Sequence, residues 1–210
     1  MTPAPGSHYF DATPGPPGGH RSVEYRVAGR TLQVTTAGGV FSPGRLDPGT
    51  GVLLRHAARP PGHGDLLDLG CGWGPLTLAM ALLSPDATVW AVDVNPRARE
   101  LTAANAADHD LAGVRVADPD EVPDDLRFAA IWSNPPIRVG KEALHDLLLR
   151  WLPRLEPGAS AWLVVQRNLG ADSLHRWLAH ALAGSAVVER TGSAKGYRVL
   201  RVRRPPAPPG

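Results

Sequence analysis

The sequence is poor in several residue types, and each shortage excludes a class of protein. Its single cysteine cannot form a disulfide within the chain, and its eight histidines follow none of the spacings that bind zinc, so no metal is predicted. No apolar run reaches the roughly 18 residues of a membrane-spanning helix, and Met1–Gly19 contains no apolar signal core. These absences predict a cytoplasmic protein with no membrane partner.

Lysine is also scarce. Only Lys141 and Lys195 are lysines among the 22 basic residues, which leaves 20 arginines, and the formal net charge is only +2. Abundant alanine, glycine and proline accompany this bias, as in proteins from genomes of high GC content, so arginine richness alone is weak evidence for nucleic-acid binding. The arginines of 198–204 fit two interpretations equally well: contact with phosphates, or solvation of an edge strand.

The length and the hydrophobic content predict one folded domain. A chain of 210 residues with 43% hydrophobic residues can bury a full core. Residues 1–21 are rich in proline and glycine and are expected to be mostly irregular, with His8-Tyr9-Phe10 as their only anchor. The domain is expected over residues 22–203, and residues 204–210 form a Pro-rich tail.

The hydrophobic pattern predicts an α/β fold. Val23–Val27 and Thr31–Thr36 alternate with period two and indicate a β-hairpin extension. Seven short apolar strands then interleave with amphipathic helices. The strands are expected at 66–69, 88–93, 114–117, 128–132, 161–166, 186–189 and 197–202, and the longer helices at 76–83, 97–108, 141–152 and 172–182. We therefore expect a Rossmann-like, mostly parallel sheet with helices on both faces.

A glycine loop joins the first of these strands to the following helix. Gly70-Cys71-Gly72-Trp73-Gly74 follows the apolar run and Pro75 opens the helix, so backbone N–H groups are expected to face a nucleotide-like ligand. A dinucleotide-binding loop has glycine or alanine at the position of Pro75. A ligand without a pyrophosphate therefore fits better, and Cys71 is expected to be a small packing residue.

An acidic residue ends the second strand. Asp93 lies 23 positions after Gly70, where a carboxylate can accept hydrogen bonds from both hydroxyls of a ribose, with Val94 beside it. The alternative is that Asp93 only caps the next helix, which opens near Asn95-Pro96. The spacing favours the ligand-binding role.

The segment after the fourth strand carries the predicted chemistry. The lone pair of an exocyclic amino nitrogen is delocalised, and two acceptors that bind its hydrogens, the Asn134 side-chain oxygen and the Pro135 carbonyl, would orient it for reaction. Asn134-Pro135-Pro136 could otherwise be an inert turn. Arg138 and Lys141 follow, and they could bind a phosphate or simply solvate the start of a helix.

These motifs resemble those of known enzymes. Asp68-Leu69-Gly70-Cys71-Gly72-Trp73-Gly74 resembles the first motif of class I S-adenosylmethionine-dependent methyltransferases. Asn134-Pro135-Pro136-Ile137 resembles the Asn-Pro-Pro-aromatic motif of amino-nitrogen methyltransferases. Upstream, the strings 39–42, 46–47 and 49–50 are similar to the lead-in of the family that contains the ribosomal-RNA small-subunit guanine-N2 methyltransferases, and Lys195–Val199 resembles that family's antiparallel last strand.

The resemblance implies roles for individual residues. It implies S-adenosylmethionine as the cofactor, bound by the loop residues Asp68, Gly70, Gly72 and Gly74 and by Asp93, Val94 and Asn134. Phe41 and Thr50 would lie beside the cofactor, although the residues alone predict Thr50 as the N-cap of a short helix beginning at Gly51. Asp118 would bind the adenine amino group. Ile137 stands where an aromatic residue usually stacks on the target base.

The sequence therefore predicts an N-methyltransferase whose substrate is a guanine exocyclic amine in RNA, most simply ribosomal RNA. One alternative is methylation of a glutamine side chain in a protein, because the same two acceptors suit an amide nitrogen. The other is a cofactor-binding module without activity, which the intact Asn134, Pro135 and Asp93 argue against. Nothing in the sequence predicts the oligomeric state.

Overall fold

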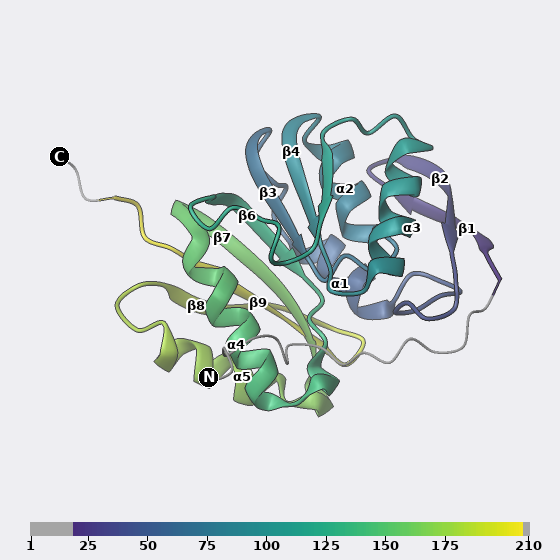
Figure 1. Cartoon of the computed structure of the whole chain (residues 1–210). Coiled ribbons are helices and arrows are strands. Elements are labelled where there is room, and N and C mark those ends of the chain that lie inside the picture. Colours follow the sequence, from purple (N-terminus) through teal and green to yellow (C-terminus); the bar gives the residue numbers. More distant parts are fainter. Residues whose placement is uncertain (1–18, 208–210) are drawn as a thin grey trace, which may run out of the picture.

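The computed structural model describes residues 19–207, so His8-Tyr9-Phe10, most of the N-terminal segment and the end of the Pro-rich tail lie outside the described residues. The described chain forms one seven-stranded sheet, flanked by helices, and a separate two-stranded hairpin (Figure 1). None of the described helices has the length and apolar character needed to cross a membrane.

The large sheet has the predicted topology. Its strands are β3 (His63–Leu69), β4 (Asp86–Val92), β5 (Val114–Ala117), β6 (Phe128–Ser133), β7 (Leu155–Gln166), β8 (Val187–Ala194) and β9 (Tyr197–Arg203). Their spatial order is β5-β4-β3-β6-β7-β9-β8, and β9 alone runs in the direction opposite to the other six strands. The prediction of a mostly parallel sheet with a reversed last strand is confirmed. The order reverses between β3 and β6, which leaves a crevice at the carboxyl ends of the strands.

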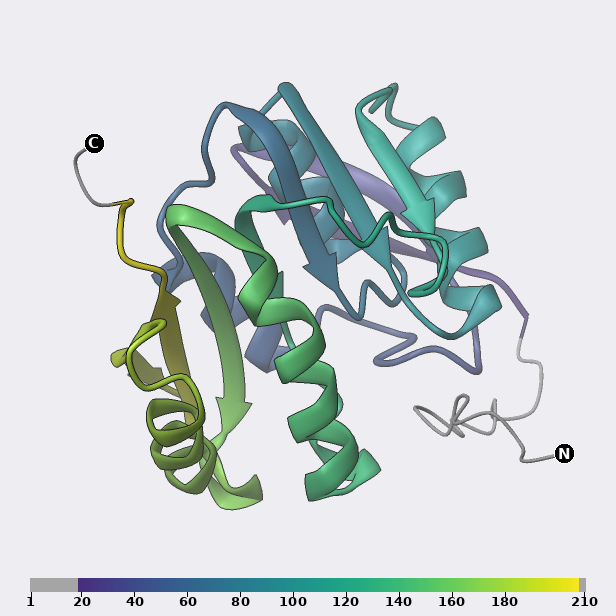
Figure 2. The same ribbon diagram turned by 60° about the vertical axis from the view of Figure 1, so that its left-hand side comes forward.

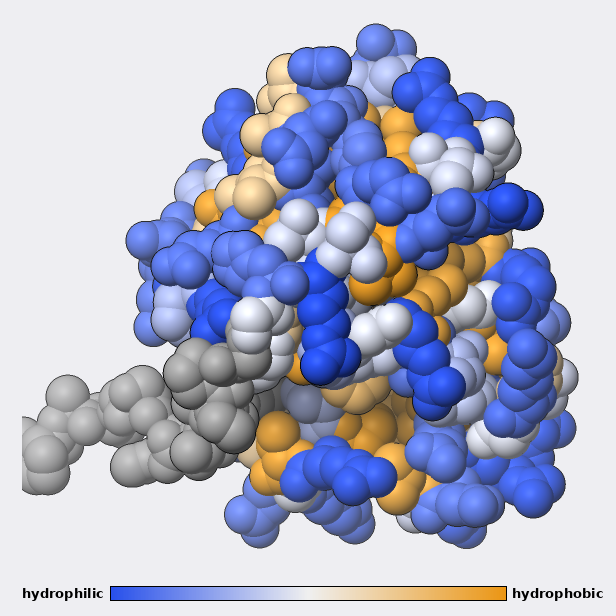
Figure 3. Space-filling model, turned by 90° about the vertical axis from the view of Figure 1, so that its right-hand side faces the viewer, coloured by the Kyte–Doolittle hydropathy of each residue, from blue (hydrophilic) through white to orange (hydrophobic). Residues whose placement is uncertain are grey.

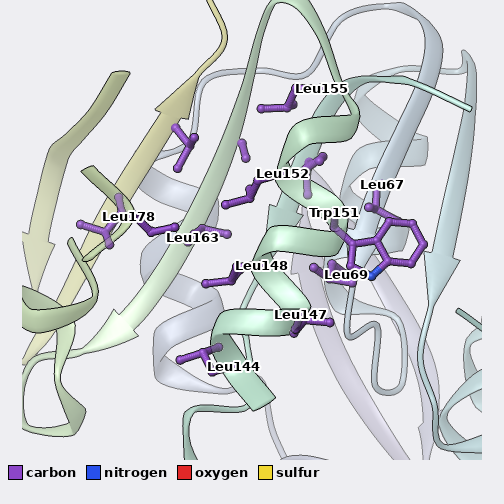
Figure 4. Packing of buried hydrophobic residues seen from close by; sticks show 14 of the residues in the cluster. Leu67, Leu69, Leu144, Leu147, Leu148, Trp151, Leu152, Leu155, Leu163 and Leu178 are labelled. Carbon is purple, nitrogen blue, oxygen red and sulfur yellow. The ribbon is translucent and has the colours of Figure 1, made fainter. Parts of the chain in front are cut away.

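Helices cover both faces of this sheet (Figure 2). Helices α1 (Pro48–His56), α2 (Pro75–Leu83) and α3 (Pro96–Ala107) lie on one face, and α4 (Lys141–Trp151) and α5 (Ala171–Ala181) lie on the other. Leu66 packs with the first group and Leu67 with the second, as expected for a central strand that is buried on both sides. In Figure 4, Trp151 and Leu147 of α4 lie against Leu67 and Leu69 of β3.

The hairpin packs mainly against α2, α3 and the glycine loop. Its strands β1 (Arg21–Val27) and β2 (Arg30–Thr36) confirm the predicted hairpin, and the buried Tyr25 hydroxyl donates to the Pro75 carbonyl at 2.8 Å. Burial raises the pKa of Tyr25. The Asn105 side chain bonds both backbone groups of Thr35 and donates to the Trp73 carbonyl at 2.8 Å. These bonds connect the hairpin to the glycine loop and fix the loop's outer side.

Candidate active site

The crevice at the strand ends contains a cavity of about 460 Å³. The face drawn in Figure 3 has a hollow that apolar residues line. Residues that follow β3, β4, β6 and β7 border the cavity together with Tyr197, the first residue of β9. Its volume suits a ligand the size of a nucleoside derivative.

Two glycines of the loop present bare backbone to this cavity. Gly70 and Gly72 have φ of +83° and +60°, and a Cβ built on either would meet no atom within 4 Å. A side chain here would be strained and would fill the ligand space. The N–H groups of this loop were expected to be free to bind a ligand. Those of Gly70 and Cys71 instead donate to the Val92 carbonyl, at 2.8 and 3.1 Å. The loop ends are thereby held against β4.

Gly74, predicted to bind the cofactor, does not line the cavity. It is the N-cap of α2 with φ of +96°, and a Cβ there would lie 3.2 Å from the Thr102 side chain. Its missing side chain therefore lets α2 approach α3. Cys71 is buried next to it and its pKa is raised by burial, so the predicted packing role is confirmed.

Asp93 is fixed at the edge of the cavity. Its carboxylate accepts from the Gly72 N–H at 3.0 Å and from the Asn95 N–H at 2.9 Å. Asn95, and not Asp93, is the N-cap of α3, which removes the helix-capping alternative. Burial raises the pKa of Asp93, and each oxygen keeps lone-pair capacity for a further donor. Val94 lines the cavity beside it.

Asp118 does not line the cavity, and its expected contact with adenine stays a prediction. One of its oxygens pairs with Arg99 at 2.8 Å and the other accepts from the Asp120 N–H at 3.1 Å. Arg99 also donates to the Asp93 carbonyl at 2.7 Å, so the pair ties the ends of β4 and β5 together. The next residue, Pro119, lines the cavity instead of Asp118.

Asp68 is completely buried beneath the loop. Its Oδ2 accepts from the Thr77 hydroxyl at 2.6 Å, while Oδ1 has no hydrogen-bond partner within residues 19–207. Asp68 borders a second, small cavity that also reaches Asp47, Thr50 and Asn134. Burial raises the pKa of Asp68 to about 7. The unpartnered oxygen next to a cavity suits a cationic group of a ligand.

This raised pKa predicts how stability depends on pH. Between the unfolded value near 3.8 and about 7, the native state holds a proton that the unfolded chain has released. Rising pH through this window therefore destabilises the ligand-free protein, by at most ~4 kcal/mol. Urea unfolding should show that the free energy of unfolding falls more between pH 5 and pH 8 in the wild type than in Asp68→Asn. Equal losses in the two proteins would contradict the assignment.

The N-terminus of α1 lies beside Asn134. The sequence predicted Thr50 as its N-cap, but the helix begins at Pro48 and Asp47 is the N-cap, accepting from the Thr50 N–H at 2.9 Å. Proline is well suited to this first helical position, so the helix starts earlier than predicted. Thr50 is a buried residue inside the first turn.

Asp47 and Thr50 set the orientation of the Asn134 amide. The Asn134 Nδ2 group donates to Asp47 Oδ1 at 2.8 Å and to Thr50 Oγ1 at 3.0 Å. A carboxylate only accepts hydrogen bonds, so the amide must turn its NH2 group toward α1. The Asn134 oxygen has no partner among the described residues, and Asn134 lines the cavity. An acceptor is therefore left available at the predicted position.

The remaining predicted residues are divided between the wall and the rim. Pro135, Pro136, Ile137 and Arg138 line the cavity. Phe41 also lines it and is 63% exposed, so its ring stands at the rim. Lys141 is exposed at the first residue of α4 and does not line the cavity.

No site role was predicted for Asp47, Gln166 or Tyr197, which also line the cavity. Gln166 and Tyr197 are direct partners across β7 and β9, so their side chains project to the same side of the sheet. The Tyr197 ring packs on Gly49, where a Cβ would lie 2.7 Å from the ring. Burial and the charge of Asp47 raise the pKa of Tyr197. Because β9 runs antiparallel to β7, its first residue, Tyr197, lies at the edge where the parallel strands end.

Removing one of the two oxygens that accept from Asn134 Nδ2 tests whether α1 orients the Asn134 amide. Thr50→Val keeps the shape of the side chain but removes its oxygen, whereas Thr50→Ser keeps the oxygen. Losing one such hydrogen bond costs about 1 kcal/mol, or roughly fivefold. We expect kcat of the reaction that Asn134 is predicted to serve to fall by about that factor in Thr50→Val and to recover in Thr50→Ser. Equal rates in the two variants would show that Thr50 does not position Asn134.

The fold and the cavity define a class of protein. A seven-stranded sheet with this order and a reversed last strand, a bare glycine loop after β3 and an acid after β4 define the class I S-adenosylmethionine-dependent methyltransferases. The residues fit this cofactor, because Gly70 and Gly72 leave space that a Cβ would fill and the Asp93 carboxylate borders that space. No cluster of metal-binding side chains occurs in the described part of the chain.

Comparison with known proteins identifies the family. A family model described as "Methyltransferase small domain" matches residues 31–201. YbxB of Bacillus subtilis is 30% identical over 200 residues, which cover 94% of this chain and 98% of that protein. Ribosomal RNA small subunit methyltransferase C of Pseudomonas putida is 33% identical over 179 residues, covering 82% of this chain and 51% of that protein.

A solved structure is also similar. The T. thermophilus 16S rRNA N2 methyltransferase RsmC, in complex with AdoMet and guanosine, has a TM-score of 0.74 and 26% identity, covering 88% of this chain and 50% of that chain. The present chain thus spans nearly the whole of YbxB but about half the length of the P. putida and T. thermophilus proteins. It belongs to the methyltransferase small domain family. It is an S-adenosylmethionine-dependent methyltransferase.

Proposed function

We propose that this protein methylates the exocyclic N2 amine of a guanine in RNA, with ribosomal RNA as the first candidate, and that residues 22–203 form the methyltransferase domain. The observation that carries the proposal is the fixed Asn134 amide, whose oxygen is left available at the cavity. The relatives named as ribosomal RNA methyltransferases support RNA as the substrate class. A cytoplasmic location stays a prediction.

The glycine-loop side of the cavity would hold the cofactor. Gly70 and Gly72 would let it approach the backbone, and Asp93 would accept hydrogen bonds from the two ribose hydroxyls. Val94 and Pro119 offer apolar surface for the adenine, and Phe41 would cover the ligand from the rim. When bound, S-adenosylmethionine supplies a methyl group that is already activated on a sulfonium.

The Asn134 side of the cavity would hold the target base. The Asn134 oxygen and the Pro135 carbonyl would accept the two hydrogens of the amino group and so turn its lone pair toward the methyl group. The nitrogen gains the methyl group and gives up one hydrogen as a proton to solvent. Because both acceptors are fixed before the substrate arrives, they need no reorganisation during the reaction.

Ile137 would contact the face of the base. An aliphatic side chain stacks less well on a base than an aromatic ring does, so the base gains less from this contact. Arg138, at the cavity, and Lys141, one residue beyond Gly140, would compensate by binding phosphates next to the target nucleotide. Ile137 is also the observation that favours glutamine methylation as the second candidate, since an amide side chain needs no stacking partner.

The substrate class can be tested without knowing the target. Purified protein is incubated with radiolabelled S-adenosylmethionine and an extract of a strain that lacks the gene, and RNA species are then separated by size and from protein. We expect label in one RNA species, and none when an Asn134→Ala variant is used. Label in a protein band would overturn the RNA proposal and favour glutamine methylation.

A further inference from the structure

We propose that Arg167 and Lys195, on the far side of the cavity from the glycine loop, form a second phosphate-binding edge for the RNA strand. This inference rests on the proposed function, because it assigns residues to the same substrate. Neither residue belongs to a predicted motif for catalysis or cofactor binding. The two are brought together by the end of β7 and the turn between β8 and β9.

Both residues are close in the chain to residues that line the cavity. Gln166 and Tyr197 line the cavity, and Arg167 and Lys195 lie one and two residues away from them in sequence. The Arg167 N–H donates to the Gly196 carbonyl at 2.8 Å, which joins the two loops. Both side chains are exposed. In Figure 2 the loop after β7 and the start of α4 lie at the same end of the molecule, so these cations extend the edge that begins at Arg138 and Lys141.

Several basic residues near the C-terminal strands are paired within the described part of the protein, whereas the four next to the cavity are not. Three arginines of residues 198–204 are bound within the protein: Arg198 to Asp172 and Ser193, Arg201 to Ser160, and Arg204 to the Leu155 carbonyl. Arg203 has no such partner among residues 19–207. By contrast, the side chains of Arg138, Lys141, Arg167 and Lys195 have no hydrogen-bond or ion-pair partner within residues 19–207. The arginine-rich last strand is therefore used mainly for internal contacts, while the cavity mouth keeps free positive charge.

The backbone at Lys195 provides a second argument. Lys195 and Gly196 form the two-residue turn between β8 and β9, with φ of +49° and +81°. A turn of this kind favours asparagine or glycine at its first position, and a lysine there is strained. At the first residue of α4, Lys141 is likewise unfavourable, since the helix dipole repels a cation at that end. Both lysines occupy positions where a lysine lowers the local stability of the fold, and a role in phosphate binding accounts for both.

The test compares two double variants. Lys195→Asn with Arg167→Gln removes both charges, and asparagine also suits the turn, so thermal stability should not fall. Arg30→Gln with Arg55→Gln is the matched control, because these arginines are also exposed and have no partner within residues 19–207, but they do not line the cavity. Binding of a fluorescein-labelled, guanine-containing single-stranded RNA is measured across a salt series by anisotropy, and cofactor affinity is measured by calorimetry.

Loss of two phosphate contacts should reduce the slope of log K against log salt by about 1.4 and weaken binding roughly 25-fold at 0.1 M salt. The control pair should retain the wild-type slope, and cofactor affinity should stay unchanged in both. A wild-type slope in the Lys195→Asn, Arg167→Gln protein would overturn this inference and leave the proposed function standing. Absence of salt-dependent RNA binding by the wild type would overturn both.

Discussion

Replacing Asn134 by alanine is expected to lower kcat for methyl transfer by roughly 100- to 1,000-fold while cofactor affinity stays within about twofold. The variant removes the fixed amide oxygen that would bind the amino hydrogens, so the lone pair of the nitrogen is no longer directed at the methyl group. It also leaves Asp47 and Thr50 without their shared donor, but both of these keep their places in the first turn of α1.

The measurement is methyl incorporation at saturating S-adenosylmethionine, with calorimetry for cofactor binding. Asn168→Ala is a matched control, because Asn168 is an exposed asparagine in the loop after β7 and does not line the cavity. The control should retain wild-type kcat. Activity in Asn134→Ala close to that of the control would mean that the amide oxygen does not orient the substrate.

Replacing Asp93 by alanine should weaken cofactor binding and leave kcat at saturating cofactor nearly unchanged. We expect S-adenosylmethionine to bind about 30- to 200-fold more weakly, corresponding to loss of ~2–3 kcal/mol from charge-assisted hydrogen bonds to the ribose. The carboxylate also holds the Gly72 and Asn95 N–H groups, so the loop loses part of its support. Asp93→Asn keeps one acceptor oxygen and should fall between alanine and wild type.

Calorimetry with S-adenosylmethionine measures this loss, and thermal unfolding without ligand shows whether the variant is folded. At cofactor concentrations that saturate the variant, kcat should recover to near the wild-type value. Unchanged cofactor affinity in a folded Asp93→Ala protein would place the ribose elsewhere in the cavity.

The sequence pattern predicted the sheet because most of its strands are apolar runs separated by stretches of helical length. Parallel strands end at one edge, so the glycine loop, Asp93 and Asn134 had to come together once the strands were correctly assigned. The family resemblance supplied the reversal of the last strand, which the alternation of strands and helices does not determine.

Contacts between segments far apart in the chain could not be predicted in this way. The Asn134 amide is oriented by residues 84 and 87 positions earlier, and nothing local marks Asp47 as its partner. Asp118 is drawn to Arg99 on the preceding helix, and the packing of Gly74 depends on Thr102. In each case the deciding neighbour comes from another element, so local patterns gave the residue but not its role.

Methylation of guanine N2 at the Asn134 site can be measured by mass spectrometry of nucleosides. Ribosomal RNA from the deletion strain is incubated with S-adenosylmethionine and either the wild-type protein or Asn134→Ala, then digested to nucleosides. We expect new N2-methylguanosine with the wild type and none above background with the variant. A methylated nucleoside other than N2-methylguanosine, or equal N2-methylguanosine with both proteins, would contradict it.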